Sequence, residues 1–196
     1  MYHLDGNDEF NHIHCDDLWV YNKLQLSRCL GYTCGPIGTI VPKPDFYIIR
    51  PAINFLGMGR FARVEWIEKF TDMHHPGEFW CEIFKGEHLS VDFYQHKSEL
   101  VVLGTRNLED PYYKWKKWEK IDRKIEFPKI LTDLKGNYDW INCEFVDGNL
   151  IEVHFRRNPD FRYGNSIAIP VWEDEKIENM QFIEDQDYFR KGFYIK

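Results

Sequence analysis

The stretch WINCEFVDGNLIEVHFR, residues 140–156, decides the fold of this 196-residue chain. It predicts two β-strands, residues 140–145 and 150–156, separated by the turn-forming residues Asp147-Gly148-Asn149. Successive side chains of a strand point to opposite faces, and the residue types alternate accordingly. One face carries Ile141, Cys143, Phe145, Ile151, Val153 and Phe155, and the other carries Asn142, Glu144, Glu152, His154 and Arg156. We therefore expect an antiparallel hairpin with an apolar back and a charged front.

The length of the connecting loop decides whether the two charged faces coincide. A two-residue turn would pair Glu144 with Ile151 and would bury a carboxylate on the apolar side. A three-residue loop, with Asn149 in the left-handed conformation, pairs Glu144 with Glu152 instead. Only this second register keeps the apolar faces together, so we expect a three-residue loop.

Two carboxylates that face each other across strands, Glu144 and Glu152, repel each other. A divalent cation between them would reverse the sign of this interaction, since Mg²⁺ is bound through one or two carboxylates together with phosphate oxygens. The same register places Asn142 opposite His154, and Arg156 adds a guanidinium suited to phosphate. The hairpin therefore predicts a metal and phosphate site, whereas the alternative is a solvated outer face of an edge hairpin.

The rest of the sequence predicts many short strands and few helices. Apolar and β-branched runs bounded by Gly and Pro predict strands at residues 45–51, 61–67, 79–84, 89–95, 100–105 and 112–126. Periodic apolar residues predict helices at residues 19–30 and 128–134, and the Gly- and Pro-rich residues 35–44 predict a loop. This order indicates an α+β chain dominated by antiparallel strands.

Composition narrows the class of protein. Apolar residues make up 43% of the chain and aromatic residues 17%, which is typical of a globular protein with a hydrophobic core. The net charge of −7 argues against a general nucleic-acid or membrane-surface binder. No apolar run reaches the length of a membrane span, and the acidic N-terminus is unlike a signal peptide. We therefore expect a cytoplasmic protein.

The hairpin resembles the late strand pair of the ATP-grasp family. That family has a metal-binding Glu on the first strand and a Glu-x-Asn-x-Arg pattern on the second. Here Glu144 matches the first, and residues 152–156 match the second with His154 in place of Asn. The resemblance implies that Glu144, Glu152 and His154 hold Mg²⁺, or that His154 contacts a phosphate or the substrate instead. It also implies that Arg156 stabilises an acyl phosphate.

Segments further upstream resemble the family's phosphate-binding parts, in the family's order. Residues 22–24 resemble the helix that supplies the first ATP-phosphate lysine, which implies this role for Lys23. Residues 47–51 resemble the strand that supplies the second lysine, with Arg50 in its place. Residues 57–60, Gly57-Met58-Gly59-Arg60, resemble the glycine-rich loop whose backbone N–H groups approach the phosphates.

Residues 81–92 resemble the adenine hinge of the family and the strand that follows it. The implied adenine contacts are backbone groups of Glu82 and Phe84, and His88 falls where the family has a ribose-binding Glu. The resemblance covers residues 19–157 and implies that the cofactors are ATP and Mg²⁺.

The resemblance implies an α+β fold of two lobes, built from antiparallel sheets with few helices and lacking the usual N-terminal domain. We expect a lead-in over residues 1–18 and a core over residues 19–157, with a small lobe over about 36–80 and a large lobe over about 81–157. Residues 158–196 would form a C-terminal extension that packs on the core. This extension, a second copy of the chain or a partner protein could hold the substrate.

The implied activity is a ligase reaction that depends on Mg²⁺ and ATP. ATP would convert a small-molecule or peptide carboxylate to an acyl phosphate, which an amine or thiol would attack. Arg106, after the strand at residues 100–105, could contact the substrate or a phosphate, or could be a plain surface arginine. Two alternatives are a catalytically idle nucleotide-binding module and a nucleotidyl-transfer or nucleic-acid-processing enzyme. The interleaved aromatic residues and lysines of residues 112–118 favour the last of these.

Overall fold

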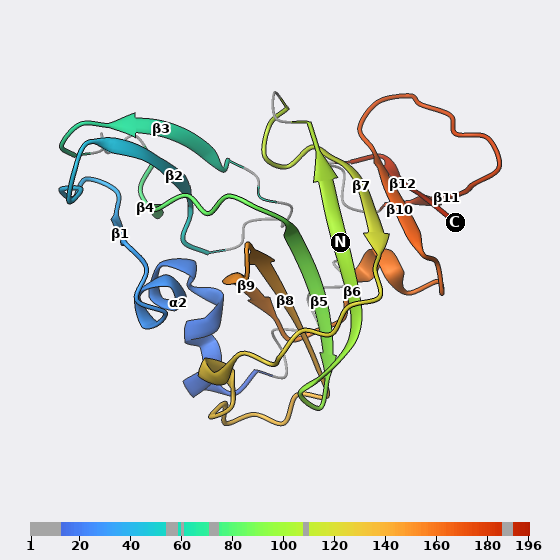
Figure 1. Cartoon of the computed structure of the whole chain (residues 1–196), viewed down its shortest axis with the longest axis horizontal. Helices are drawn as coiled ribbons and strands as arrows, with labels where there is room; N and C mark the ends of the chain where they lie inside the picture. The colour runs from blue at the N-terminus through green and yellow to red at the C-terminus, as the bar shows by residue number, and fades with distance from the viewer. Residues whose placement is uncertain (1–12, 54–58, 60, 71–74, 108–109, 186–189) are drawn as a thin grey trace.

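A computed structural model of the protein describes residues 13–53, 59, 61–70, 75–107, 110–185 and 190–196. Their strands form two antiparallel sheets, as the sequence predicted (Figure 1). The smaller sheet has the order β1-β4-β2-β3 and contains β1 (Cys34–Pro36), β2 (Asp45–Pro51), β3 (Arg63–Ile67) and β4 (Glu78–Cys81). β1 overlaps the start of the segment 35–44 that was predicted as a loop, because pairing with β4 holds this Gly- and Pro-containing stretch extended.

The larger sheet has the order β11-β12-β10-β7-β6-β5-β8-β9. Its strands are β5 (His88–Tyr94), β6 (Lys97–Arg106), β7 (Trp115–Lys120), β8 (Trp140–Val146), β9 (Asn149–His154), β10 (Ile167–Val171), β11 (Gln181–Glu184) and β12 (Gly192–Ile195). The C-terminal extension therefore continues the sheet of the core, since β10 pairs directly with β7. The lobe and extension boundaries stay predictions.

Short helices complete the fold. They are η1 (Cys15–Tyr21), α2 (Lys23–Cys29), η2 (Lys129–Leu131) and η3 (Pro159–Phe161). The single helix predicted over residues 19–30 is wrong, because the extended Asn22 separates η1 from α2 and its side chain caps α2 by accepting from the Gln25 backbone N–H. The helix predicted over residues 128–134 shortens to the one turn of η2. Among the described residues, no helix has the length and apolar character needed to cross a bilayer.

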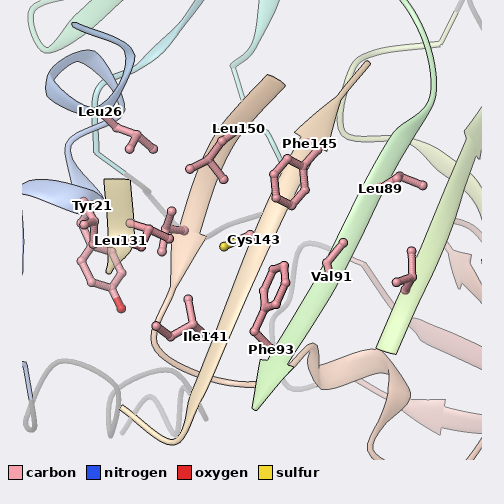
Figure 2. Close-up of a cluster of buried hydrophobic side chains, with 13 residues drawn as sticks. Tyr21, Leu26, Leu89, Val91, Phe93, Leu131, Ile141, Cys143, Phe145 and Leu150 are labelled. Carbon is pink, nitrogen blue, oxygen red and sulfur yellow. The ribbon is translucent and has the colours of Figure 1, made fainter. Parts of the chain in front are cut away.

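The main hydrophobic core lies on one face of the larger sheet. β5, β8 and β9 supply the side chains at its centre, and η1, α2 and η2 cover them (Figure 2). The core includes Tyr21, Leu26, Leu89, Val91, Phe93, Leu131, Ile141, Cys143, Phe145, Leu150 and Val153. Because alternate residues of each strand point away from this core, the opposite face of β5, β8 and β9 is left for polar side chains.

Candidate functional site

The pairing of β8 with β9 confirms the predicted register. Glu144 lies opposite Glu152, and Asn142 lies opposite His154. These four residues share the face of the larger sheet that points away from the main core. The sequence therefore places two carboxylates, an amide and an imidazole side by side on two adjacent strands.

The turn that produces this register differs from the predicted three-residue loop. Val146 pairs with Asn149, so the turn contains only Asp147 and Gly148. Their φ angles are 51° and 77°, which is the pair of positive φ values that a tight type I′ hairpin turn requires. The prediction that Asn149 adopts the left-handed conformation is wrong, because Asn149 already belongs to the β9 ladder.

A β-bulge restores the alignment of the two polar faces. Phe145 pairs with Leu150, but the next pair is Glu144 with Glu152, so Ile151 is an extra residue on β9. Leu150 enters the main core, whereas Ile151 lines the cleft described below. The prediction that Ile151 shares the apolar face is wrong, since a bulge shifts the alternation of a strand by one residue.

A cleft of about 1220 Å³ runs between the two sheets, and the polar face of β5, β8 and β9 forms one of its walls. Such a volume is sufficient for a nucleotide together with a second ligand. The cleft brings together every predicted site residue that the structure describes. They are Lys23, Arg50, Gly59, Glu82, Phe84, His88, Arg106, Glu144, Glu152, His154 and Arg156. The predicted residues Gly57 and Arg60 lie outside the described part of the chain.

Lys23 and His154, both of which line the cleft, contact the carboxylate of Glu152. Lys23 Nζ lies 3.0 Å from Oε2, and His154 Nε2 lies 3.0 Å from Oε1. Lys23 reaches this position because its backbone N–H, at the start of α2, donates to the carbonyl of Ala52 just beyond β2. The carboxylate accepts from His154 Nε2, so that nitrogen carries the imidazole proton. His154 therefore orients Glu152 and does not present Nε2 as a free metal ligand.

Glu144 has a different partner on the neighbouring strand β5. His88 Nε2 lies 3.0 Å from Glu144 Oε2. The His88 ring packs edge-on against Trp115 and Trp118, with centroid separations of 4.6 and 5.6 Å. This contact links the position predicted to bind ribose to the position predicted to bind metal. Glu144 is the more accessible carboxylate of the pair, with 28% of its side chain exposed.

Two arginines of the cleft have buried nitrogens without a hydrogen-bond partner in the described part of the chain. They are Nε of Arg50 and Nη1 of Arg106. The two guanidinium groups lie over the rings of Phe79 and Tyr112, at 5.2 and 4.0 Å from the ring centroids. An unpaired buried donor costs about 1–3 kcal/mol. Both arginines are therefore suited to an anionic ligand that supplies the missing acceptor.

The hinge between the sheets leaves a specific pair of backbone groups for a ligand. The Glu82 N–H donates to the Thr33 carbonyl over 2.9 Å, and Glu82 Oε1 accepts from the Thr33 N–H over 2.7 Å. Glu82 can therefore offer only its carbonyl from the backbone. Phe84, whose ring packs edge-on against Tyr32, can offer its N–H. One acceptor and one donor of the backbone are therefore left for a ligand in the cleft.

A buried polar network lies along the wall of the cleft and was missed by the sequence reasoning. Asn142 Nδ2 donates to Ser90 Oγ and to Asp92 Oδ1, at 2.9 and 2.8 Å. Asn158 donates to the same two oxygens, through its side chain to Ser90 and its backbone N–H to Asp92. Burial raises the pKa of Asp92, although these hydrogen bonds oppose the effect. The alternation of polar and apolar residues along β5 was the available signal for Ser90 and Asp92.

The C-terminal extension contributes to the cleft an ion pair that the sequence reasoning also missed. Arg190 donates to both carboxylate oxygens of Asp160, over 2.7 and 2.6 Å, and also donates to Asp185. Arg190 and Asp160 are buried and line the cleft. The two partners are about 30 residues apart in sequence, and no local pattern relates them.

Comparison with solved structures places the fold in a known class. An ATP-grasp superfamily protein from Archaeoglobus fulgidus matches with a TM-score of 0.54 and 15% sequence identity, over 91% of this chain and 63% of that chain. The ATP-grasp ligase PsnB, in complex with a minimal precursor, matches with a TM-score of 0.39 and 14% identity, over 75% and 54% of the two chains. No protein-family model and no curated protein matches the chain. The chain has an ATP-grasp-like α+β fold and spans less than two thirds of either structure.

Proposed function

We propose that this chain binds Mg²⁺ and ATP in the cleft and ligates a carboxylate to an amine or a thiol, with release of ADP and phosphate. The observation that carries the proposal is the cross-strand pair of Glu144 and Glu152, which faces cationic side chains within a cleft between two sheets. Two acidic ligands beside several cationic groups make a site for a metal-bound polyphosphate.

The residues present fit Mg²⁺. Glu144 and Glu152 supply carboxylate oxygens from adjacent strands, and Mg²⁺ is commonly bound by one or two carboxylates together with substrate phosphates. Lys23 neutralises Glu152, and His88 forms a hydrogen bond with Glu144, so both carboxylates have a partner before a cation binds. When bound, Mg²⁺ would neutralise charge on the phosphates of ATP.

The chain's own cations and backbone groups would position the nucleotide. Lys23 and Arg50 would contact phosphates, as would the glycine-rich loop of residues 57–60, of which the structure describes only Gly59. The Glu82 carbonyl and the Phe84 N–H would bind the adenine edge, and His88 would lie near the ribose. The unpaired Nε of Arg50 supports this assignment, because a phosphate oxygen would satisfy it.

The carboxylate substrate would lie towards Arg106 and Arg156. The phosphoryl group moves from ATP to the carboxylate, and the resulting acyl phosphate then loses phosphate as the amine or thiol adds. Arg106 and Arg156 would hold the carboxylate and balance the charge of the acyl phosphate. Asp160 and Arg190 of the extension also line the cleft, which supports the extension itself as the element that encloses the substrate.

A second candidate function is that of a catalytically idle nucleotide-binding module. The ion pair of Lys23 with Glu152 favours it, because a lysine that neutralises a metal ligand competes with both the cation and the phosphate. The two functions differ in whether bound ATP is turned over to ADP. Release of AMP would instead favour nucleotidyl transfer.

Calorimetric titration with Mg²⁺ and a non-hydrolysable ATP analogue tests the proposal. We expect wild-type binding, and we expect Glu144→Gln and Glu152→Gln each to abolish it without loss of the far-ultraviolet circular dichroism spectrum. Glu99→Gln, an equal charge change at an exposed position of β6, is the matched control and should bind like wild type. Unchanged binding by both cleft variants would contradict the assignment of Glu144 and Glu152 as metal ligands. Absence of binding by wild type would contradict the whole proposal.

A further inference from the structure

Asn142 lies on the wall of the cleft, beside the two opposed carboxylates. It lies on β8 two residues before Glu144, on the same face, and directly opposite His154. Only 3% of the residue is exposed, yet it lines the cleft. An asparagine in this position can present either its amide nitrogen or its amide oxygen to a ligand, and the surrounding hydrogen bonds decide which.

The hydrogen bonds of Asn142 fix the orientation of its amide. Asp92 Oδ1 accepts a hydrogen bond from the backbone N–H of Asn158 over 2.8 Å, so this oxygen is an acceptor. The Asn142 atom that lies 2.8 Å from it must therefore be the amino group. The second amide proton goes to Ser90 Oγ over 2.9 Å. With both amide protons committed to Ser90 and Asp92, the amide oxygen is the group left for a ligand in the cleft.

Asn142 Oδ1 is available to a ligand. It accepts no hydrogen bond from any described residue, and it is not among the fully buried unpaired atoms of the described chain. His154, on the opposite strand, is committed through Nε2 to Glu152. An amide oxygen also suits a hard cation such as Mg²⁺ better than an imidazole nitrogen does.

We infer that Asn142 Oδ1 is the third protein ligand of the divalent cation held by Glu144 and Glu152, and that His154 is a positioning residue for Glu152. This inference rests on the metal site of the proposed function. Asp92 and Ser90 then form the outer contacts that hold the amide oxygen towards the cleft. Such outer contacts commonly change metal affinity by about 10- to 100-fold when they are removed.

Two substitutions at the same position separate a ligand from a structural residue. Asn142→Leu and Asn142→Asp both remove the donors to Ser90 and Asp92, so a purely structural role predicts similar losses. A ligand role predicts opposite results, since aspartate restores an oxygen ligand and leucine does not. We expect Asn142→Leu to weaken Mn²⁺ binding by about tenfold or more, and Asn142→Asp to bind Mn²⁺ at least as tightly as wild type.

The probe is Mn²⁺ with inorganic tripolyphosphate, which contains no nitrogen, and free Mn²⁺ is measured by electron paramagnetic resonance. Electron spin-echo modulation of the bound Mn²⁺ should show no imidazole nitrogen coupling, in wild type or in His154→Gln. Equal weakening in both Asn142 variants, or a nitrogen coupling that disappears in His154→Gln, would overturn the inference while leaving the metal site in place. Absence of Mn²⁺ binding by wild type would overturn the metal site and the inference together.

Discussion

Lys23 Nζ lies 3.0 Å from Glu152 Oε2, and only 6% and 11% of these two side chains are exposed. The contact joins the start of α2 to β9, next to the pair of opposed carboxylates. In a buried ion pair each charge compensates the other, so removal of one partner leaves an uncompensated buried charge. The same contact therefore supports the fold and sets the charge of the candidate site.

Lys23→Met is expected to lower the free energy of unfolding by roughly 3–5 kcal/mol, because it leaves Glu152 buried without its cation. Urea unfolding followed by tryptophan fluorescence measures this change. Mn²⁺ should recover part of the loss, since a divalent cation between Glu144 and Glu152 replaces the missing positive charge.

Lys43→Met is the matched control for this substitution. Lys43 forms an ion pair with Asp45 over 2.8 Å, but the side chains are 72% and 44% exposed. An exposed pair contributes about 0–1 kcal/mol, so this variant should unfold close to wild type. An equal decrease in the free energy of unfolding in the two variants would show that burial does not make the Lys23 ion pair more important than an exposed one.

Deletion of Ile151 should leave the pairing of Glu144 with Glu152 intact. Ile151 is the extra residue of the bulge, so without it Leu150 and Glu152 follow each other as they would in a regular hairpin. We expect Mn²⁺ binding in the presence of tripolyphosphate to be retained, as measured by calorimetry.

Deletion of Val153 is the contrasting variant. It would move His154 to the core face of β9 and would remove a side chain that is 1% exposed. We expect a loss of roughly 3 kcal/mol or more in the free energy of unfolding, together with loss of metal binding. Retention of binding after this deletion, or loss of it after deletion of Ile151, would contradict the register.

The hairpin of β8 and β9 was predicted from the sequence in part. The alternation of β8 and β9 predicts the pair of Glu144 with Glu152, because only one pairing keeps the apolar faces together. The predicted length of the loop was wrong, because a three-residue loop and a two-residue turn with a bulge at Ile151 both pair Glu144 with Glu152. A bulge is settled by twist and packing, which single-residue preferences do not record.

Contacts between residues far apart in the chain could not be predicted from the sequence, for a different reason. The role of Asn142 depends on Ser90 and Asp92, which lie about 50 residues earlier and reach it only through the pairing of β8 with β5. The extension was expected to pack on the core, and the sequence did not indicate that β10 would pair with β7. Local periodicity predicts that such strands exist and does not predict their neighbours.

Asp92 should make stability depend on pH. Burial raises its pKa in the folded protein, against the hydrogen bonds from Asn142 and Asn158, so the folded state holds the proton more tightly than the unfolded state. Its contribution to stability is therefore complete below the unfolded pKa of about 3.9 and is lost as pH rises through the raised value. Asp92→Asn removes this titration.

Urea unfolding of Asp92→Asn and wild type over the range from about pH 4 to neutral measures the effect. We expect the variant to gain stability relative to wild type as pH rises. Asp122→Asn, at an exposed position after β7, controls for the loss of one carboxyl group. A constant difference between Asp92→Asn and wild type over this range would contradict the buried, proton-retaining state of Asp92.

The ion pair of Arg190 with Asp160 should hold the C-terminal strands against the cleft. Arg190→Met leaves Asp160 buried without its cation, and we expect a loss of roughly 3–5 kcal/mol in the free energy of unfolding. The double variant Arg190→Met/Asp160→Leu removes both charges and should recover most of this loss, because apolar replacement of a whole buried pair is often neutral. The remaining partner, Asp185, has 19% of its side chain exposed and can be hydrated. A double-mutant cycle by urea unfolding gives the coupling energy directly, and additive losses would show that the two residues act independently.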